Sequence, residues 1–203
     1  QAAFIDIGTE KNSFIHLKDI LDKVDESKEK LNVNIDISNV AKTGQKLLVQ
    51  VKKDSNIQKG ARVSTHINLP SKYIALMPNT DIVTISQKIT DKKEQERLVK
   101  LVKENLSKGN GAIIRTSAIG KEQEIIEDIK DVETKWKKIE TTFKNDKGNT
   151  PKLIAKSENI VEKMLIDLPE NSIQKITIKN KKDYEKMLEF KEKKSYLKST
   201  EIE

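Results

Sequence analysis

The stretch GAIIRTSAIG, residues 111–120, joins a short apolar strand to a turn of small residues, and Arg115 ends the strand. Of the 39 basic residues in the chain, 36 are lysine and only three are arginine. Arginine offers a rigid planar fork of donors that can bind phosphate or carboxylate through two hydrogen bonds, whereas lysine acts as a mobile point charge. With the hydroxyl of Thr116 and the unpaired amides of a following helix, Arg115 suits a phosphate monoester. A surface arginine paired with a glutamate fits the same pattern.

Segments on both sides of this strand predict an α+β unit. Residues 72–78 and 82–89 have the composition of strands, and residues 91–106 have helical periodicity. Asp91 and Glu94 predict a capping box at the start of that helix. Its apolar face is expected to consist of Leu98, Leu101, Val102 and Leu106.

A second helix is predicted over residues 121–146, with apolar residues spaced alternately by four and three. The stripe consists of Ile125, Ile129, Val132, Trp136, Ile139 and Phe143. About three heptads are short for a coiled coil, so we assign Trp136, the only tryptophan, to the core. The alternative is a non-catalytic interaction module that docks a protein partner through this stripe.

The first third of the chain predicts short strands separated by charged turns, which is typical of a small Greek-key barrel of the OB type. The strands are expected at residues 2–8, 13–17, 46–54 and 61–69, with a short helix at 18–24. Phe4 and Phe14 fall on adjacent strands, and Lys59 and Arg62 lie in the next turn and strand. Aromatic and basic groups on one face bind single-stranded nucleic acid. Phenylalanines that fill the core fit the same positions.

The C-terminal segment predicts a fragment of α/β character beyond a turn at residues 147–151. A helix is expected at 157–168, a strand at 173–180 and a second helix at 181–194. Three elements are too few to cover both faces of a sheet, so we expect an incomplete domain.

Composition excludes several kinds of site. The absence of cysteine rules out disulfides and thiolate metal sites in this chain and favours a cytoplasmic location. His16 and His66 are far apart in sequence, and no glycine-rich phosphate loop occurs. Asp6, expected inside a strand, is the one candidate catalytic carboxylate and has no evident partner, so we assign no catalytic or metal-binding residue. No apolar run approaches the ~20 residues of a membrane span.

The net charge of +7 and the isoelectric point near 9.3 suit an anionic partner, although a general abundance of lysine would produce the same values. The first residue is Gln1, and a strand is predicted directly after it. We therefore expect a piece of a longer polypeptide.

Several long motifs resemble the ribonuclease E/G family of bacterial endoribonucleases in order and spacing. They are AAFIDIG, KNSFIHLKDI, KGARVSTHINLPSKYIALMPN, ISQKI and GNGAIIRTSA, followed by the tryptophan-bearing helix. The resemblance covers nearly the whole chain and weakens after residue 157. It implies an OB-fold RNA-binding domain lacking its first strand at 1–66, a 5′-sensor domain at 67–157 and part of an RNase H-like domain at 158–203.

The resemblance also implies roles for individual residues. Phe4, Phe14 and Lys59 match positions that contact single-stranded RNA, and we add Arg62 to them. Arg115 and Thr116 match the pair that binds the 5′-monophosphate of RNA.

Two positions of the implied phosphate site depart from the family pattern. Ser71 replaces a usual glycine whose backbone lies near the phosphate, and Ala75 replaces a bulkier aliphatic residue. The serine puts the backbone geometry of the site in question.

Catalysis is expected to require parts outside this chain. The resemblance implies that the full-length enzyme is an Mg²⁺-dependent endoribonuclease of RNA processing and decay. Its catalytic aspartates and its structural zinc link, through which homo-oligomers form, would lie beyond residue 203. We expect this fragment to be inactive alone.

Overall fold

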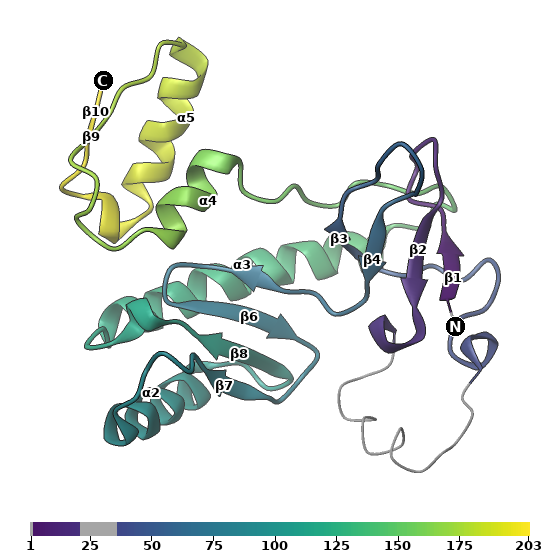
Figure 1. Cartoon of the computed structure of the whole chain (residues 1–203), viewed down its shortest axis with the longest axis horizontal. Coiled ribbons are helices and arrows are strands. Elements are labelled where there is room, and N and C mark those ends of the chain that lie inside the picture. The colour runs from purple at the N-terminus through teal and green to yellow at the C-terminus, as the bar shows by residue number, and fades with distance from the viewer. Residues whose placement is uncertain (1, 21–35) are drawn as a thin grey trace.

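The computed structural model describes residues 2–20 and 36–203, and its regular elements form three successive units (Figure 1). The expected helix at 18–24 falls mostly outside these residues. Within them, a 3₁₀ turn, η1, spans Leu17–Asp19, and another, η3, spans Ile37–Asn39. No helix of the described segments is both long and apolar enough to cross a bilayer.

The first unit is an open sheet of four strands in the order β1-β2-β4-β3. The strands are β1 (Ala2–Ile5), β2 (Ser13–His16), β3 (Gln50–Lys53) and β4 (Arg62–Ser64). β1 and β3 are antiparallel to their neighbours, whereas β2 and β4 are parallel to each other. Ile15 and Val63 are fully buried, so one face of this sheet forms a core.

Gly60 lets the turn before β4 approach the turn before β2. A Cβ atom at this position would lie 2.0 Å from the carbonyl oxygen of Asn12, which leaves no space for a side chain.

The second unit is a mixed four-stranded sheet in the order β5-β6-β8-β7, and two helices pack against it (Figure 1). Its strands are β5 (Leu69–Pro70), β6 (Ile74–Pro78), β7 (Val83–Ile85) and β8 (Asn110–Ile114). Its helices are α2 (Lys92–Asn105) and α3 (Gln123–Asn145), with the 3₁₀ turn η4 (Thr116–Ala118) between β8 and α3.

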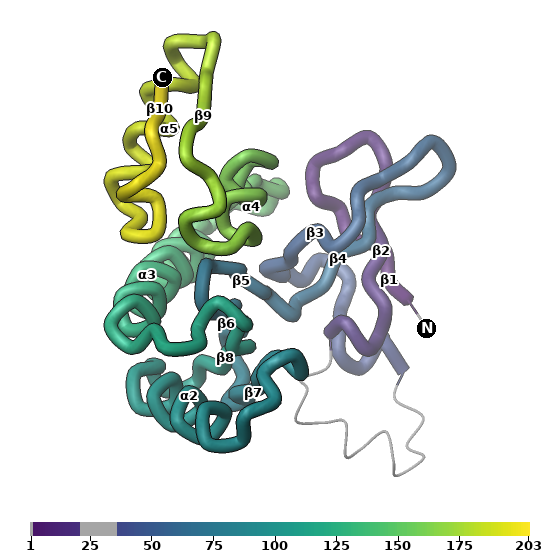
Figure 2. The backbone as a smooth tube through the Cα atoms, turned by 60° about the vertical axis from the view of Figure 1, so that its left-hand side comes forward, coloured from purple at the N-terminus to yellow at the C-terminus, as the bar shows by residue number. Residues whose placement is uncertain are grey.

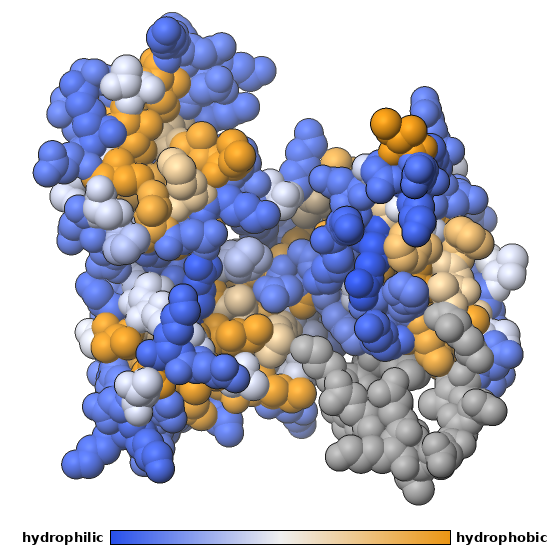
Figure 3. Space-filling view, viewed as in Figure 1, coloured by the Kyte–Doolittle hydropathy of each residue, from blue (hydrophilic) through white to orange (hydrophobic). Residues whose placement is uncertain are grey.

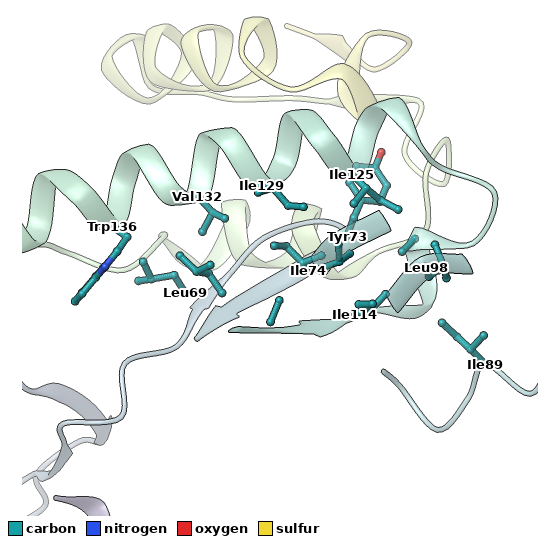
Figure 4. Close-up of a cluster of buried hydrophobic side chains, with 14 of the residues drawn as sticks. Leu69, Tyr73, Ile74, Ile89, Leu98, Ile114, Ile125, Ile129, Val132 and Trp136 are labelled. Atoms are coloured by element: carbon teal, nitrogen blue, oxygen red, sulfur yellow. The ribbon is translucent and has the colours of Figure 1, made fainter. Parts of the chain in front are cut away.

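The predicted stripe of α3 packs into the core of this second unit. Ile125, Ile129, Val132 and Trp136 are at most 6% exposed, and they face Leu69 and the strands (Figure 4). Ile139 packs at the edge of the same cluster. The assignment of Trp136 to the core is therefore confirmed, and the alternative of a partner docking on the stripe is unsupported because the stripe is covered from Ile125 to Trp136. Phe143, at its end, is half-buried and lies outside this cluster.

The predicted capping box of α2 forms only in part. Asp91 accepts a hydrogen bond from the N–H of Lys93, as a cap should. Glu94 instead binds the guanidinium of Arg97 and the N–H of Gly120, which ties α2 to the turn before α3.

The third unit is small and stands beside α3 (Figure 2). It contains α4 (Ile160–Asp167), β9 (Lys175–Ile176), α5 (Lys181–Glu192), the 3₁₀ turn η5 (Ser195–Leu197) and β10 (Glu201–Ile202). β10, which the sequence pattern did not predict, pairs in parallel with β9. The core of this unit consists of Leu165, Met187 and Leu197.

The α+β class is thus confirmed, while no sheet in the described residues closes into a barrel. The OB-type and RNase H-like assignments and the three domain boundaries stay predictions. The expected position of Asp6 inside a strand is wrong. β1 ends at Ile5, and the Asp6 carboxylate accepts the N–H of Gly8, which has a φ of 80° and so makes a turn.

Candidate functional site

A row of aromatic and basic side chains crosses the first sheet. Phe4 is paired with Phe14 and Phe14 with Arg62, and Arg62 is paired with Lys53 at an irregularity where the register of β3 shifts, so the four residues follow one another across the sheet. Phe4 is 80% exposed, and Phe14 is half-buried with an edge-on contact to the ring of His16 at 5.5 Å. The interpretation of both phenylalanines as core is therefore wrong, because the core lies on the opposite face.

The basic residues of this aromatic row differ in how firmly other side chains hold them. Arg62 binds the Asp19 carboxylate through Nε at 3.2 Å and Nη2 at 2.8 Å, whereas Lys53 is exposed. Lys59 lies outside the row, in a tight turn where its N–H and C=O both bond to Asn56. The structure thus brings three of the four predicted RNA-binding residues together, places Lys59 in the adjoining turn and adds Lys53.

The side chain of Arg115 lies where β8 ends against the turn between β5 and β6. Its backbone N–H donates to the carbonyl of Tyr73 at 2.9 Å. Nη1 donates to the carbonyl oxygen of Ser71 at 3.0 Å, and Nη2 donates to the carboxylate of Asp167 at the end of α4. The Arg115 side chain is 26% exposed, and Thr116 beside it is exposed.

The 3₁₀ turn η4 uses backbone N–H groups that the sequence predicted to be free for a phosphate. The N–H groups of Ala118 and Ile119 bond back to the carbonyls of Arg115 and Thr116, and α3 begins only at Gln123. The amides at the start of α3 therefore do not directly follow Thr116, contrary to the expectation from sequence.

A buried carboxylate supports the turn that carries Ser71. Asp128 on α3 is 6% exposed and accepts hydrogen bonds from the Ser71 hydroxyl and from the N–H groups of Tyr73, at 2.9 Å, and Ile74, at 3.3 Å. Burial raises the pKa of Asp128, although these donors oppose the shift. The Ser71 hydroxyl thus binds Asp128 and its carbonyl binds Arg115, while its predicted role in phosphate binding stays a prediction.

Ala75 is part of the sheet rather than of an open pocket. It is 9% exposed and paired with Pro70 on β5 and Ile113 on β8. No described contact joins its methyl group to the Arg115 guanidinium, so its predicted role in phosphate binding rests on the resemblance alone.

Lys72 joins the second unit to the third. Its side chain is 1% exposed, and Nζ donates to the carbonyls of Leu165, at 3.1 Å, and Leu168 while lying 4.6 Å from the centre of the Tyr196 ring. The helical partner of the Leu165 carbonyl would be the N–H of Pro169, which proline lacks, so the ammonium replaces a missing donor. Burial lowers the pKa of Lys72.

A second polar link lies next to Lys72. The hydroxyl of Tyr73 and the ammonium of Lys121, at 2.8 Å, both donate to the carboxylate of Glu170. Burial alone would raise the pKa of Glu170, but these two hydrogen bonds lower it overall. Glu170 is thus held as an anion at the seam between the units.

Sequence reasoning missed four residues of this region: Lys53, Lys72, Asp128 and Asp167. A signal existed for Asp128, because it lies directly before Ile129 and three positions after Ile125, on the side of the helix that is buried. Lys72 carries no such signal among 36 lysines. Lys53 and Asp167 become visible only through strand register and the placement of α4.

His16 and His66 both lie among the residues that the structure describes. Within residues 2–20 and 36–203, no group of three histidine, aspartate or glutamate side chains could hold a metal ion.

Comparison with known proteins identifies the family. The sequence profile of the Ribonuclease E/G family matches residues 68–203, including the C-terminal segment where the resemblance was weakest. Ribonuclease G of Escherichia coli (strain K12) is 42% identical over 144 residues, which cover 68% of the chain and 29% of that protein. The chain belongs to the Ribonuclease E/G family.

Less similar relatives match as well. Ribonuclease G of Haemophilus influenzae is 38% identical over 143 residues, covering 68% of the chain and 29% of that protein. A Ribonuclease E/G-like protein of Pyropia yezoensis is 35% identical over 168 residues, covering 82% of the chain and 32% of that protein. The chain therefore spans less than a third of the length of these relatives.

Proposed function

We propose that this chain is the part of a ribonuclease E/G-type endoribonuclease that binds single-stranded RNA and senses its 5′-monophosphate. The observation that carries this proposal is the aromatic row on the first sheet. Phe4 is 80% exposed, although burying a phenylalanine is favourable by about 1.5–3 kcal/mol. With Phe14 beside it, the exposed ring offers a face on which an RNA base can stack.

The neighbours of Phe4 suit RNA as well. Base stacking on an aromatic side chain contributes about 1–3 kcal/mol per base, and basic side chains neutralise the phosphate backbone. Phe14 lies beside Phe4, and Lys53 and Arg62 continue the row. We assign this sheet to an OB-type fold lacking a strand, because that fold presents such groups on an open face.

Arg115 and Thr116 are the proposed 5′-phosphate site. A guanidinium held by the Ser71 carbonyl is oriented before a ligand arrives, which reduces the entropy lost on binding. Thr116 is exposed beside it and adds a hydroxyl donor. A 5′-hydroxyl carries no charge and has one oxygen, so it binds this pair less strongly and the site favours RNA with a 5′-monophosphate.

Cleavage itself is proposed for the longer enzyme. We expect Mg²⁺ to be bound, and water to be activated, by carboxylates outside this chain. We also assign the structural zinc and assembly into homo-oligomers to the longer protein, and the third unit to an RNase H-like domain.

The test compares two short single-stranded RNAs that differ only in a 5′-monophosphate or a 5′-hydroxyl, with binding followed by fluorescence anisotropy. The wild-type chain should bind the phosphorylated RNA more tightly, and Arg115→Lys should remove the difference because lysine cannot make the bidentate contact. Arg97→Lys, at an arginine paired with Glu94 on α2, is the matched control. Equal binding of both RNAs by the folded wild type would contradict the 5′-sensing part.

Phe4→Ala tests the RNA-binding surface separately. Because Phe4 is exposed, the variant should keep its stability while binding to both RNAs weakens by about 1–3 kcal/mol. Unchanged affinity for both RNAs would remove the aromatic row from the RNA-binding surface.

A further inference from the structure

All three arginines lie in ion pairs, but the pair of Arg115 differs from the others. The pairs are Arg62 with Asp19, Arg97 with Glu94, and Arg115 with Asp167. In the first two, both Nε and Nη2 bind the carboxylate, and the side chain of the acid is only 13% and 19% exposed. Asp167 binds Nη2 alone and is 62% exposed. Its carboxylate is therefore held by a single contact and can move into solvent.

The guanidinium nitrogen that Asp167 binds matters for phosphate binding. A guanidinium offers two edges for a bidentate contact, one formed by Nε and Nη2 and the other by Nη1 and Nη2. Nη2 belongs to both edges, and Nη1 already donates to the Ser71 carbonyl. A phosphate that binds Arg115 through either edge must approach the Asp167 carboxylate, which carries the same sign of charge.

The stability of α4 does not explain why an aspartate occupies position 167. Asp167 is the last residue of that helix, where the helix dipole disfavours a negative charge. The helix end is attached without it, because Lys72 binds the carbonyls of Leu165 and Leu168, on either side of Asp167. Glu170 adds the contacts to Tyr73 and Lys121. Asp167 can therefore leave Arg115 while α4 stays in place.

From this geometry we infer that Asp167 is an internal competitor for the phosphate that Arg115 binds, and so sets the affinity of the site for phosphorylated RNA ends. The inference rests on the proposed function of Arg115. In the absence of RNA the carboxylate neutralises the guanidinium. A terminal phosphate, with its greater charge and three acceptor oxygens, replaces the carboxylate, and the affinity for the phosphate is lowered by the free energy of the internal pair.

Asp167→Asn tests this competition in the full chain, with the same 5′-phosphate and 5′-hydroxyl RNAs. Exposed ion pairs are weak, and a carboxylate a few ångströms from the phosphate repels it modestly, so we expect about threefold to tenfold tighter binding of the phosphorylated RNA. Binding of the 5′-hydroxyl RNA should not change. Asp167→Glu keeps the charge on a longer side chain and should stay near the wild type.

The matched control is Asp81→Asn, which removes one exposed negative charge beyond Pro78, at the opposite end of β6 from Arg115. It should leave the ratio of the two affinities unchanged. If the wild type prefers the 5′-phosphate but Asp167→Asn leaves the ratio unchanged or lowers it, the inference is overturned and the proposed function stands. If neither protein distinguishes the RNAs, both fail. A preference that appears only in Asp167→Asn would support both.

Discussion

Lys72→Met should destabilise the chain and release α4, although it replaces a buried charge with an apolar side chain of similar length. Lys72 is 1% exposed and its ammonium donates to the carbonyls of Leu165 and Leu168. Methionine leaves two carbonyls without a donor, at about 1–3 kcal/mol each, and loses the contact with the Tyr196 ring, worth about 0.5–2 kcal/mol. Removing the buried ammonium also removes its desolvation cost of several kcal/mol, which stabilises the variant and offsets part of these losses.

The balance should be a loss of about 1–3 kcal/mol, because Pro169 cannot donate to the Leu165 carbonyl in place of Lys72. Urea unfolding followed by circular dichroism measures the loss. Hydrogen exchange should show that α4 amides lose protection while those of α3 keep theirs, since the Lys72 ammonium donates to carbonyls of the third unit and lies against its Tyr196 ring. Lys163→Met, at an exposed lysine on α4, is the control and should change stability by less than about 0.5 kcal/mol. A neutral or stabilised Lys72→Met would refute the capping role of the ammonium.

Three further changes test the second unit. Gly111→Ala should destabilise it by about 1–3 kcal/mol, seen as a lower urea midpoint, because the added Cβ would lie 2.2 Å from the carbonyl oxygen of Ile82. Asp128→Ala should lower the free energy of unfolding by about 2–5 kcal/mol, since buried donors lose their acceptor, whereas Asp128→Asn should lose less; equal losses would contradict this. The hydrogen bond from Arg97 and, to a smaller extent, that from the Gly120 amide lower the pKa of Glu94 from 4.5 to about 2. The ionised Glu94 carboxylate should therefore stabilise the fold above pH 4.5, and this stabilisation should disappear as the pH falls towards 2. Acid titrations of wild type and Glu94→Gln should differ in that window.

Local periodicity was enough to predict the elements whose burial follows their own sequence. The stripe on α3 packs as expected from Ile125 to Ile139, because residues three and four apart share a face whatever lies opposite. Strand ends were less predictable. β1 ends at Ile5 and β3 begins only at Gln50, because strand length depends on which neighbour offers hydrogen bonds.

The phenylalanines show where composition misleads. A chain with few aromatic residues is expected to bury them, and pattern alone could not separate the two faces of β1 and β2. The register between β2 and β4 distinguishes the two faces, because it pairs Phe14 with Arg62 and leaves Ile15 in the core. Figure 3 shows apolar side chains among hydrophilic ones on the surface of the first unit. Such register depends on contacts between residues about 50 positions apart.

The sequence singled out Arg115 but gave no sign of its partner Asp167. An isolated arginine in a lysine-rich chain signals a need for fixed geometry, and the Ser71 carbonyl and the Asp167 carboxylate both use that geometry. Asp167 lies 52 positions further along the chain, on a helix whose placement depends on Lys72. A lysine at position 115 could neutralise Asp167 equally well, but it could not bind the Ser71 carbonyl and still present a second planar edge to a ligand. The ion pair accounts for a positive charge at this position, and the proposed phosphate ligand supplies the further acceptor that favours arginine over lysine.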